Sequence, residues 1–212
     1  MNLKHEAAKK AIVYVEDGMK LGLGTGSTAY YFVEEVGKLV KKGYNLTCVS
    51  TSNRTTEQAL GLGIKVVDVN EIERLDLVVD GADEVDVNKN GVKGGGGALF
   101  REKIVANMAD KCIWVVDKSK MVDKLGGFKL PVEIVAFGHN HTINSINSLG
   151  YNGKLRKNDE KPYITDNNNY IYDLEMPMGY DPYKTYEELK KIVGVVEVGL
   201  FLDICDIVCV GE

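Results

Sequence analysis

The chain has no hydrophobic run that could cross a lipid bilayer, since none approaches the roughly 20 apolar residues that a membrane-spanning helix needs. The N-terminal stretch MNLKHEAAKK lacks the apolar core of a secretory signal peptide. Basic residues are not in excess either: the formal net charge is −5, whereas non-specific nucleic-acid binders carry a basic face. These absences predict a cytoplasmic protein that binds neither a membrane nor nucleic acid.

Cysteine is scarce, and its spacing forms neither a CxxC redox pair nor a zinc-binding motif. Three of the four cysteines lie in the apolar runs TCVS, KCIWVV and DIVCV, so we expect buried, reduced thiols. His139 and His141 form an H-x-H pair, but two imidazoles without a third ligand make a poor metal site. We expect these histidines to begin a helix. The cysteines are Cys48, Cys112, Cys205 and Cys209.

What the sequence does contain is an ordinary globular composition, with 44% hydrophobic and 27% charged residues among 212. Up to residue 117, short apolar runs such as NLTCVS, RLDLVVD and KCIWVVD alternate with segments of helical periodicity. This alternation predicts parallel βαβ units in an open, mostly parallel three-layer α/β sheet of Rossmann-like type. Ligands of such sheets bind at the carboxyl ends of the strands.

The pattern changes near KLPVEIVAFG, where a strand, a helix at 140–149 and the short strands KLRK, PYIT and YIYDLE follow one another. The helix PYKTYEELKKI and the strand VVEVGLF complete this part, and NNN at 167–169 is expected to be a turn. This order indicates a smaller α+β domain of ferredoxin-like type. We predict a catalytic α/β domain at 1–128 plus 203–212, with DIVCVG returning to the main sheet, and a small domain at 129–202.

The segment GLGTGSTA follows a predicted strand and opens a helix, so its backbone N–H groups and the helix dipole form an anion site. A dinucleotide fingerprint would need Gly at position 27, where Ser27 stands, and the second strand lacks the acidic residue that holds a ribose. No GK[ST] follows, which excludes a P-loop. We favour a site for one phosphate, with Thr25, Ser27 and Thr28 supplying hydroxyls, over a plain tight turn.

The segment DGAD places Asp80 and Asp83 at the end of a strand. Aspartates at such a point often cap their own turn, and paired carboxylates can also bind magnesium. Lys93 nearby opposes a cation, and no third ligand is visible. The two aspartates suit hydrogen bonding to a polyhydroxylated substrate.

The segment KGGGGALFREK sets four glycines between Lys93 and a helix that carries Glu102 near its start. Each Gly costs roughly 0.5–1 kcal/mol relative to Ala in regular structure, so bare backbone must be needed there. Glycines let a ligand touch the backbone and let consecutive N–H groups point at it. A Glu in this position is commonly an exposed helix residue. The neighbouring glycines, Lys93 and aspartates favour a functional Glu102 instead.

A further strand ends in VDKSK, which places Lys118 and Lys120 at the same sheet edge. Lys120 is the candidate for neutralising a phosphate, and Lys4 is another lysine that would reach it. The alternative is a solvated turn. Trp114, within an apolar strand, is expected in the core.

Together these segments closely resemble ribose-5-phosphate isomerase type A. The matching segments are GLGTGSTA, VSTS, DGADEVD, KGGGGALFREKI, VDKSK, LPVEI and VVEVGLF, in the family's order from residue 22 to 201. The pair DGADE and KGGGGA…REK is highly specific, whereas GLGTGST alone would not be. The stretch 138–190 matches the family least.

The resemblance implies interconversion of ribose 5-phosphate and ribulose 5-phosphate with no metal and no organic cofactor, in a homodimer or homotetramer. By motif position Glu102 would be the catalytic base, assisted by Lys93, Asp80 and Asp83. The residues that it implies as substrate contacts are Thr25, Gly26, Ser27, Thr28, Asp80, Gly81, Ala82, Asp83, Lys93, Gly94, Gly95, Gly96 and Lys120.

The chemistry fits these residue types. Moving the carbonyl from C1 to C2 requires a proton to leave C2 and return at C1 through an enediolate, which one carboxylate can manage. Lys93 and glycine N–H groups would stabilise the developing charge. Two alternatives are an amino-sugar-phosphate deaminase or acyl-CoA transferase, and a sugar-phosphate sensor, which would have no use for Glu102 as a base. No helix-turn-helix accompanies the chain, as a transcriptional sensor would need.

Overall fold

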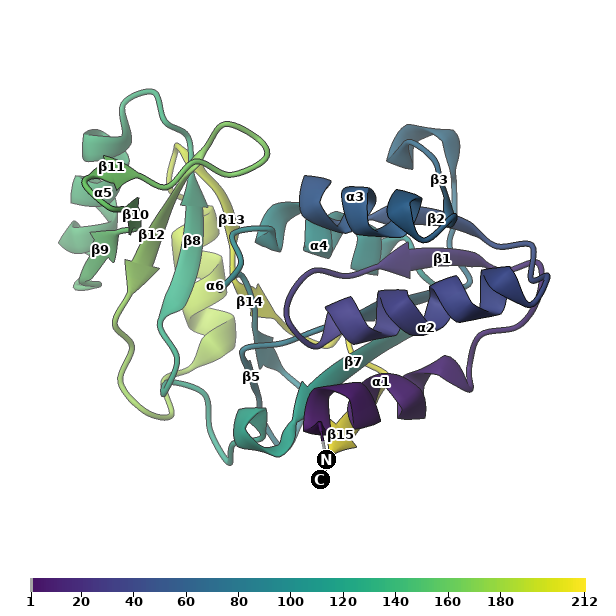
Figure 1. The fold of residues 1–212 in the computed structure, drawn as a ribbon. Helices are drawn as coiled ribbons and strands as arrows, with labels where there is room; N and C mark the ends of the chain where they lie inside the picture. The colour runs from purple at the N-terminus through teal and green to yellow at the C-terminus, as the bar shows by residue number, and fades with distance from the viewer. Residues whose placement is uncertain (1) are drawn as a thin grey trace. The chain divides into compact units, whose positions relative to one another are not determined.

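The computed structural model describes residues 2–212, which form two compact units (Figure 1). The first unit comprises the chain up to Ala82, Arg101–Met121 and Asp203–Glu212, and the second comprises Asp83–Phe100 and Val122–Leu202. The domain limits 1–128 with 203–212 and 129–202 remain a prediction. Within residues 2–212, no helix has the length and apolar character to cross a membrane.

The first unit contains a six-stranded sheet in the order β15-β7-β4-β1-β2-β3, and every neighbouring pair is parallel. This confirms the predicted α/β class. Its strands are β1 (Lys20–Leu23), β2 (Thr47–Ser50), β3 (Lys65–Val66), β4 (Leu77–Asp80), β7 (Cys112–Asp117) and β15 (Ile207–Gly211). The helical elements are α1 (Leu3–Ile12), α2 (Ala29–Lys41), α3 (Asn53–Gly61), η1 (Val69–Glu71), α4 (Leu99–Asn107, in this unit from Arg101) and η2 (Lys118–Lys120).

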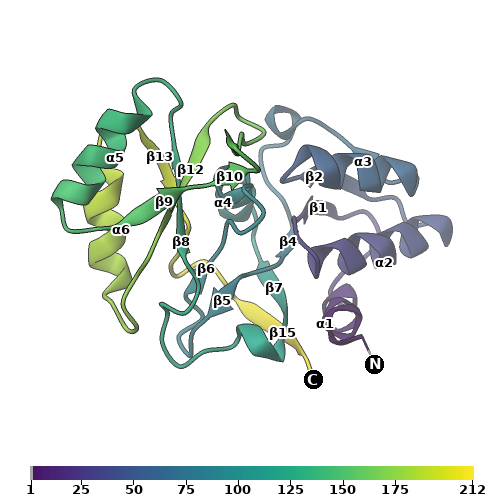
Figure 2. The same cartoon turned by 60° about the vertical axis from the view of Figure 1, so that its left-hand side comes forward.

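The sheet lies between two layers of helices (Figure 2). Apolar side chains of α1, α2 and α3 form one core cluster with every second residue of the central strands, among them Leu23 and Val79. The α4 helix covers the other face, where a Cβ on Gly22 would overlap the Val105 side chain. Trp114 is fully buried and all four cysteines are buried and unoxidised, as predicted.

The helix boundaries follow from local sequence. The Ser52 side chain accepts a hydrogen bond from the N–H of Thr55 and so caps α3. Gly43, at a φ of 100°, follows the end of α2, where a left-handed residue stops the helix. The strand DIVCVG returns to the sheet beside β7, as predicted, and Lys10 of α1 donates to the carbonyl of Val210 at 2.8 Å.

The second unit has an antiparallel sheet in the order β13-β8-β12-β9. With α5 and α6 the chain order is β8-α5-β9-β12-α6-β13, which is the predicted ferredoxin-like arrangement. The helices are α5 (His139–Ser148), which His139 begins as expected, and α6 (Pro182–Lys190). The strands are β5 (Glu84–Val85), β6 (Gly91–Val92), β8 (Leu130–Ile134), β9 (Gly153–Leu155), β10 (Lys157–Asn158), β11 (Lys161–Pro162), β12 (Tyr170–Leu174), β13 (Val195–Val198) and β14 (Leu200–Phe201).

Three strand predictions were wrong in detail. KLRK is not one strand, because β9 ends at Leu155 and β10, which belongs to another sheet, begins at Lys157. VVEVGLF is not one strand: β13 pairs with β8, whereas β14 pairs with β6 in a separate three-stranded sheet. The break falls at Gly199, where a Cβ would overlap the carbonyl oxygen of Lys93 and the backbone of Pro131. PYIT is a strand only at its start, because Thr165 belongs to the turn that the NNN segment makes.

Candidate functional site

The predicted site residues divide between the two units. Asp83, Lys93 and the glycines Gly94–Gly96 belong to the second unit, and all others belong to the first. Each group is therefore described within its own unit.

In the first unit, the loop between β1 and α2 is tied to the end of β4. The N–H of Thr25 donates to Oδ1 of Asp80 at 2.9 Å, and the N–H of Gly24 donates to the carbonyl of Val79. A Cβ at Gly24 would overlap the Asp80 carboxylate, so only glycine fits there. At Gly26 the reason is different: its φ of 125° is a backbone conformation that favours glycine. The loop thus leads its backbone into the N-terminus of α2, the geometry of an anion site.

A cluster of buried hydroxyl groups at the end of β2 and the start of α3 hydrogen-bonds to this loop. The Thr25 hydroxyl hydrogen-bonds to those of Thr51 and Ser52 at 2.7 and 2.8 Å, and Thr55 donates to the carbonyl of Gly24 at 3.1 Å. Thr25 is only 7% exposed, so its side chain fixes the loop. Thr51, Ser52 and Thr55 were not predicted as site residues. The signal was present in the run VSTS, which ends β2 at the same sheet edge.

Two lysines bring positive charge to this region. The Lys4 ammonium group donates to the Ser27 hydroxyl at 2.8 Å. At the end of β7, hydrogen bonding from the Ser119 side chain, with the charges of Lys120 and Lys4, holds the pKa of Asp117 below its ordinary value. Both ammonium groups therefore lie close enough to act on one carboxylate. Lys4 joins Lys120 as a candidate for neutralising a bound phosphate.

Among the predicted site residues of the first unit, Asp80 and Glu102 are the two carboxylates, and both are buried, with 3% and 4% of their surface exposed. Asp80 also accepts from the N–H of Gly81 at 2.7 Å, and it is followed by half-buried Ala82. Glu102 lies in the first turn of α4, where the positive end of the helix dipole favours a carboxylate. It is not the exposed helix residue that such sequences commonly contain.

In the second unit, Lys93 is 2% exposed, and its ammonium group lies 5.3 Å from the centroid of the Phe201 ring. The N–H of Lys93 donates to the carbonyl of Gly199, which holds the backbone beside β14. Asp83 accepts from the N–H of Gly95 at 2.7 Å. The structure thus brings Asp83 and the glycines together.

Three of the four glycines have an identifiable reason to be glycine. Gly94 and Gly97 have φ values of 109° and 76°, and a Cβ at Gly95 would lie 2.6 Å from Oδ1 of Asp83. The N–H of Gly97 donates to the carbonyl of Gly94, which closes a tight turn with Gly95 and Gly96 exposed at its centre. We call residues 94–97 the glycine turn.

Arg156, Tyr163 and Asp173 were not predicted as site residues. Arg156 and Tyr163 donate to carbonyl oxygens of the glycine turn, and Asp173 pairs with Arg156. The sequence showed them only as strand residues. No local pattern links them to glycines about sixty positions earlier.

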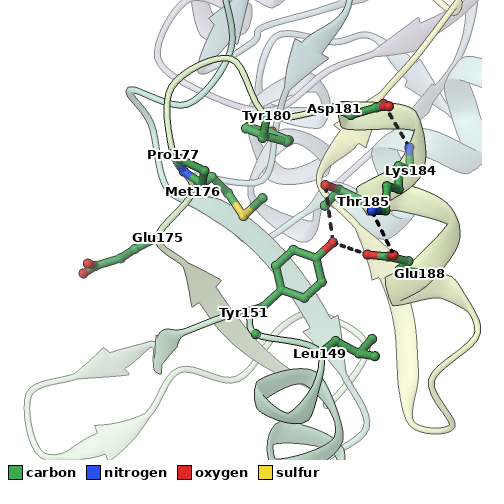
Figure 3. Close-up of a pocket in the computed structure, with 11 residues that line it drawn as sticks. Leu149, Tyr151, Glu175, Met176, Pro177, Tyr180, Asp181, Lys184, Thr185 and Glu188 are labelled. Atoms are coloured by element: carbon green, nitrogen blue, oxygen red, sulfur yellow. Dashed lines mark hydrogen bonds and ion pairs between the residues drawn. The ribbon is translucent and has the colours of Figure 1, made fainter.

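The second unit also contains a cavity of about 410 Å³ that holds none of the predicted site residues (Figure 3). The Tyr151 hydroxyl points at Thr185 and Glu188 and donates to Oε2 of Glu188 at 2.6 Å. Burial and the neighbouring Glu188 raise the pKa of Tyr151. The Asp181 carboxylate caps α6. The polar side chains of the cavity therefore bond mainly to one another.

The fold and the residue groups define a two-unit α/β protein in which a glycine-containing loop leads from the end of the first strand into the N-terminus of a helix. A family model described as Ribose 5-phosphate isomerase A (phosphoriboisomerase A) matches residues 47–212. Ribose-5-phosphate isomerase A of Streptococcus gordonii is 50% identical over 211 residues, which are 99% of this chain and 94% of that protein.

Two solved structures are similar over the whole chain. Ribose 5-phosphate isomerase A of Methanocaldococcus jannaschii is 37% identical with a TM-score of 0.93, and the match covers 100% of this chain and 95% of that one. A D-ribose-5-phosphate isomerase in complex with phospho-erythronic acid is 38% identical with a TM-score of 0.94, over 100% and 96% of the two chains. The chain belongs to the ribose 5-phosphate isomerase A family.

Proposed function

We infer that the protein is an aldose–ketose isomerase that interconverts D-ribose 5-phosphate and D-ribulose 5-phosphate. The observation that carries this inference is the full-length similarity to proteins of that name. One such structure holds phospho-erythronic acid, whose carboxylate shares a planar carbon and a delocalised negative charge with an enediolate. The same ligand is therefore a probe for this chain.

For substrate binding, we assign the phosphate to the loop of residues 25–28 at the start of α2, through the N–H groups of residues 26–28, because Asp80 already accepts from the N–H of Thr25. Lys120 and Lys4 neutralise its charge, because both lie beside Asp117 and Lys4 contacts Ser27. Phosphate is remote from the reacting carbons, so its binding energy serves to position C1 and C2. Gly81 and Ala82 bring backbone to the sugar.

For the chemistry, we assign Glu102 as the base that removes the C2 proton and returns it at C1. Its burial supports this role, because a poorly hydrated carboxylate meets the proton without first shedding water. Lys93 and N–H groups of the glycine turn stabilise the negative oxygen. Asp80 and Asp83 bind the hydroxyls and move protons during ring opening.

The test is proton NMR of ribose 5-phosphate in D₂O with the purified, metal-stripped protein. We expect ribulose 5-phosphate to appear, with deuterium entering C2 of the remaining ribose 5-phosphate. Product without deuterium would point to hydride transfer or to a shielded proton, and then to a test of metal dependence. Intact binding with neither product nor exchange would favour the sugar-phosphate sensor and refute the isomerase.

We also propose that the protein forms a homodimer or homotetramer in the cytoplasm. In the second unit, Phe137 and Val193 are each 93% exposed beside the neighbouring strands β8 and β13. Large exposed apolar side chains side by side are commonly covered by a partner. Light scattering should give a mass above one chain for the wild type and a lower mass for Phe137→Ser. Val13→Ser, at an exposed apolar residue of α1's end, is the control, and a monomeric wild type would contradict the proposal.

A further inference from the structure

A short hairpin in the second unit carries two side chains at its base. The strands β10 and β11 pair Lys157 with Pro162, so Arg156 and Tyr163 are the residues just outside the first pair. The N–H of Tyr163 donates to the carbonyl of Arg156 at 2.8 Å, and the Arg156 guanidinium lies 5.7 Å from the centroid of the Tyr163 ring. Arg156 and Tyr163 therefore lie opposite one another at the open end of the hairpin.

Both side chains bind the backbone of the glycine turn. Nη1 of Arg156 donates to the carbonyl oxygens of Gly94 and Gly95 at 2.9 and 3.0 Å. The Tyr163 hydroxyl donates to the carbonyl oxygen of Gly96 at 3.0 Å. Three successive peptide groups are thus held by their oxygens. The ring also sets the last glycine, since a Cβ at Gly97 would overlap Tyr163.

Asp173 holds the guanidinium in place. Nε and Nη2 of Arg156 donate to the two carboxylate oxygens of Asp173 at 2.9 and 2.5 Å, the two-pronged geometry that only arginine offers. Each side chain is 16% exposed. The carboxylate balances the positive charge, so Arg156 is placed to orient the backbone and not to attract a phosphate.

Binding a carbonyl oxygen also fixes the orientation of the N–H in the same peptide group. In a trans peptide the C=O and the following N–H point in opposite directions. Because Arg156 holds the carbonyl oxygen of Gly95, the N–H of Gly96 in the same peptide group points away from the guanidinium. The two neighbouring N–H groups already have acceptors. Those of Gly95 and Gly97 donate to Asp83 and to the carbonyl of Gly94, whereas the N–H of Gly96 belongs to an exposed residue.

We propose that Arg156, braced by Asp173, and Tyr163 are positioning residues of the isomerase. They fix the glycine turn so that the N–H of Gly96 is oriented, before the substrate arrives, toward the oxygen that becomes negative in the enediolate. Glycine backbone is otherwise the most mobile of any residue, and a donor must be in place to stabilise a transition state. This inference rests on the proposed function.

The first experiment compares Tyr163→Phe with Tyr172→Phe. Each change removes one hydroxyl from the second unit, but that of Tyr172 donates to Asn147 and not to the turn. Tyr163→Phe should lower kcat by about 10- to 100-fold, the order of loss for a misplaced catalytic group, with KM for ribose 5-phosphate within about twofold. Tyr172→Phe should keep kcat. Equal losses in both variants, or a change in KM alone for Tyr163→Phe, would overturn the proposal.

The second experiment tests Arg156. Arg156→Lys keeps the charge but cannot hold Asp173 and two carbonyls at once, so its kcat should fall at least as far as that of Tyr163→Phe. In Arg156→Gly, added guanidinium should restore part of kcat and methylammonium should not. Full activity of Arg156→Lys, or equal rescue by both cations, would show that the fork geometry is not needed.

A third measurement separates this inference from the proposed function. Tyr163→Phe should weaken the binding of phospho-erythronic acid, whose carboxylate carries the charge that the turn is proposed to stabilise, and should leave the affinity for inorganic phosphate unchanged. In ¹⁵N-glycine-labelled protein the same variant should shift amide signals of the glycine turn. A wild type without turnover would refute the isomerase. The ratio of the two affinities and the amide shifts would still decide whether Arg156 and Tyr163, which we call the clamp, fix the glycine turn. Unchanged ratio and shifts would refute the clamp even in an active enzyme.

Discussion

At the scale of single residues, Glu102 combines near-complete burial with the first turn of a helix. We expect Glu102→Gln to retain ribose 5-phosphate binding within a few-fold and to lose turnover by about 10²–10⁴-fold, the usual contribution of a positioned base. The amide keeps the shape but cannot take the proton. Steady-state kinetics with calorimetric binding would measure both quantities. Turnover near that of the wild type would remove Glu102 from the mechanism.

A second residue-scale prediction concerns the loop after β1. Gly24→Ala should lower the free energy of unfolding by about 1–3 kcal/mol, because its methyl group would overlap the Asp80 carboxylate in a packed region. Phosphate affinity should fall as well, since the loop is tied to Asp80. Gly61→Ala is the matched control: it adds the same methyl group at the end of α3, where nothing lies within 4 Å. The free energy of unfolding would be measured by urea titration. An equal decrease in both variants would refute the steric argument.

At the scale of elements, α1 and α2 are joined through one carboxylate. Burial favours the neutral form of Glu35, but hydrogen bonds from Lys38 and His5, 2.7 and 2.6 Å long, prevail and hold its pKa below the ordinary 4.5. A lowered pKa means that the stabilisation is complete above pH 4.5 and is lost as the pH falls through the folded-state pKa.

Glu35→Gln should therefore lower the free energy of unfolding at pH 7 by up to about 1 kcal/mol, the range for a partly exposed ion pair. The difference from the wild type should shrink in acid. Urea titrations from neutral to acidic pH would measure it, with Glu34→Gln on the same helix as the control. A difference that grows on acidification would contradict the assignment.

The elements also show what the sequence could predict. The phosphate loop, DGAD and the glycine run each lie within a few consecutive residues, and the alternation around them predicted the parallel sheet. The two-residue strands β5 and β6 were missed because so short a segment has no periodicity. The break at Gly199 depends on the carbonyl of Lys93, far away in the chain. Arg156 reaches Gly94 across 62 positions, a pairing that only the folded chain defines.

At the scale of the whole molecule, the four thiols should be almost inert. Burial raises the pKa of Cys48 to about 12 from 9.0 and also raises that of Cys209. Three pKa units mean roughly a thousandfold smaller thiolate fraction for Cys48 at neutral pH. Ellman's reagent at pH 8 should label folded protein very slowly and reveal four thiols per chain in guanidinium. Rapid labelling of the folded protein would show that the thiols are accessible.

The return of β15 to the first sheet has a consequence for synthesis on the ribosome. Asp203–Glu212 are translated after the whole of Val122–Leu202, yet they supply the strand beside β7 and the surface against which α1 packs, near both labelled ends of the chain (Figure 1). During translation the second unit can fold while β7 is still an open strand edge, the kind of edge that pairs with other chains. A nascent chain that stalls before residue 203 should thus expose an edge prone to aggregation, and the edge is covered once Asp203–Glu212 are available to pair with β7.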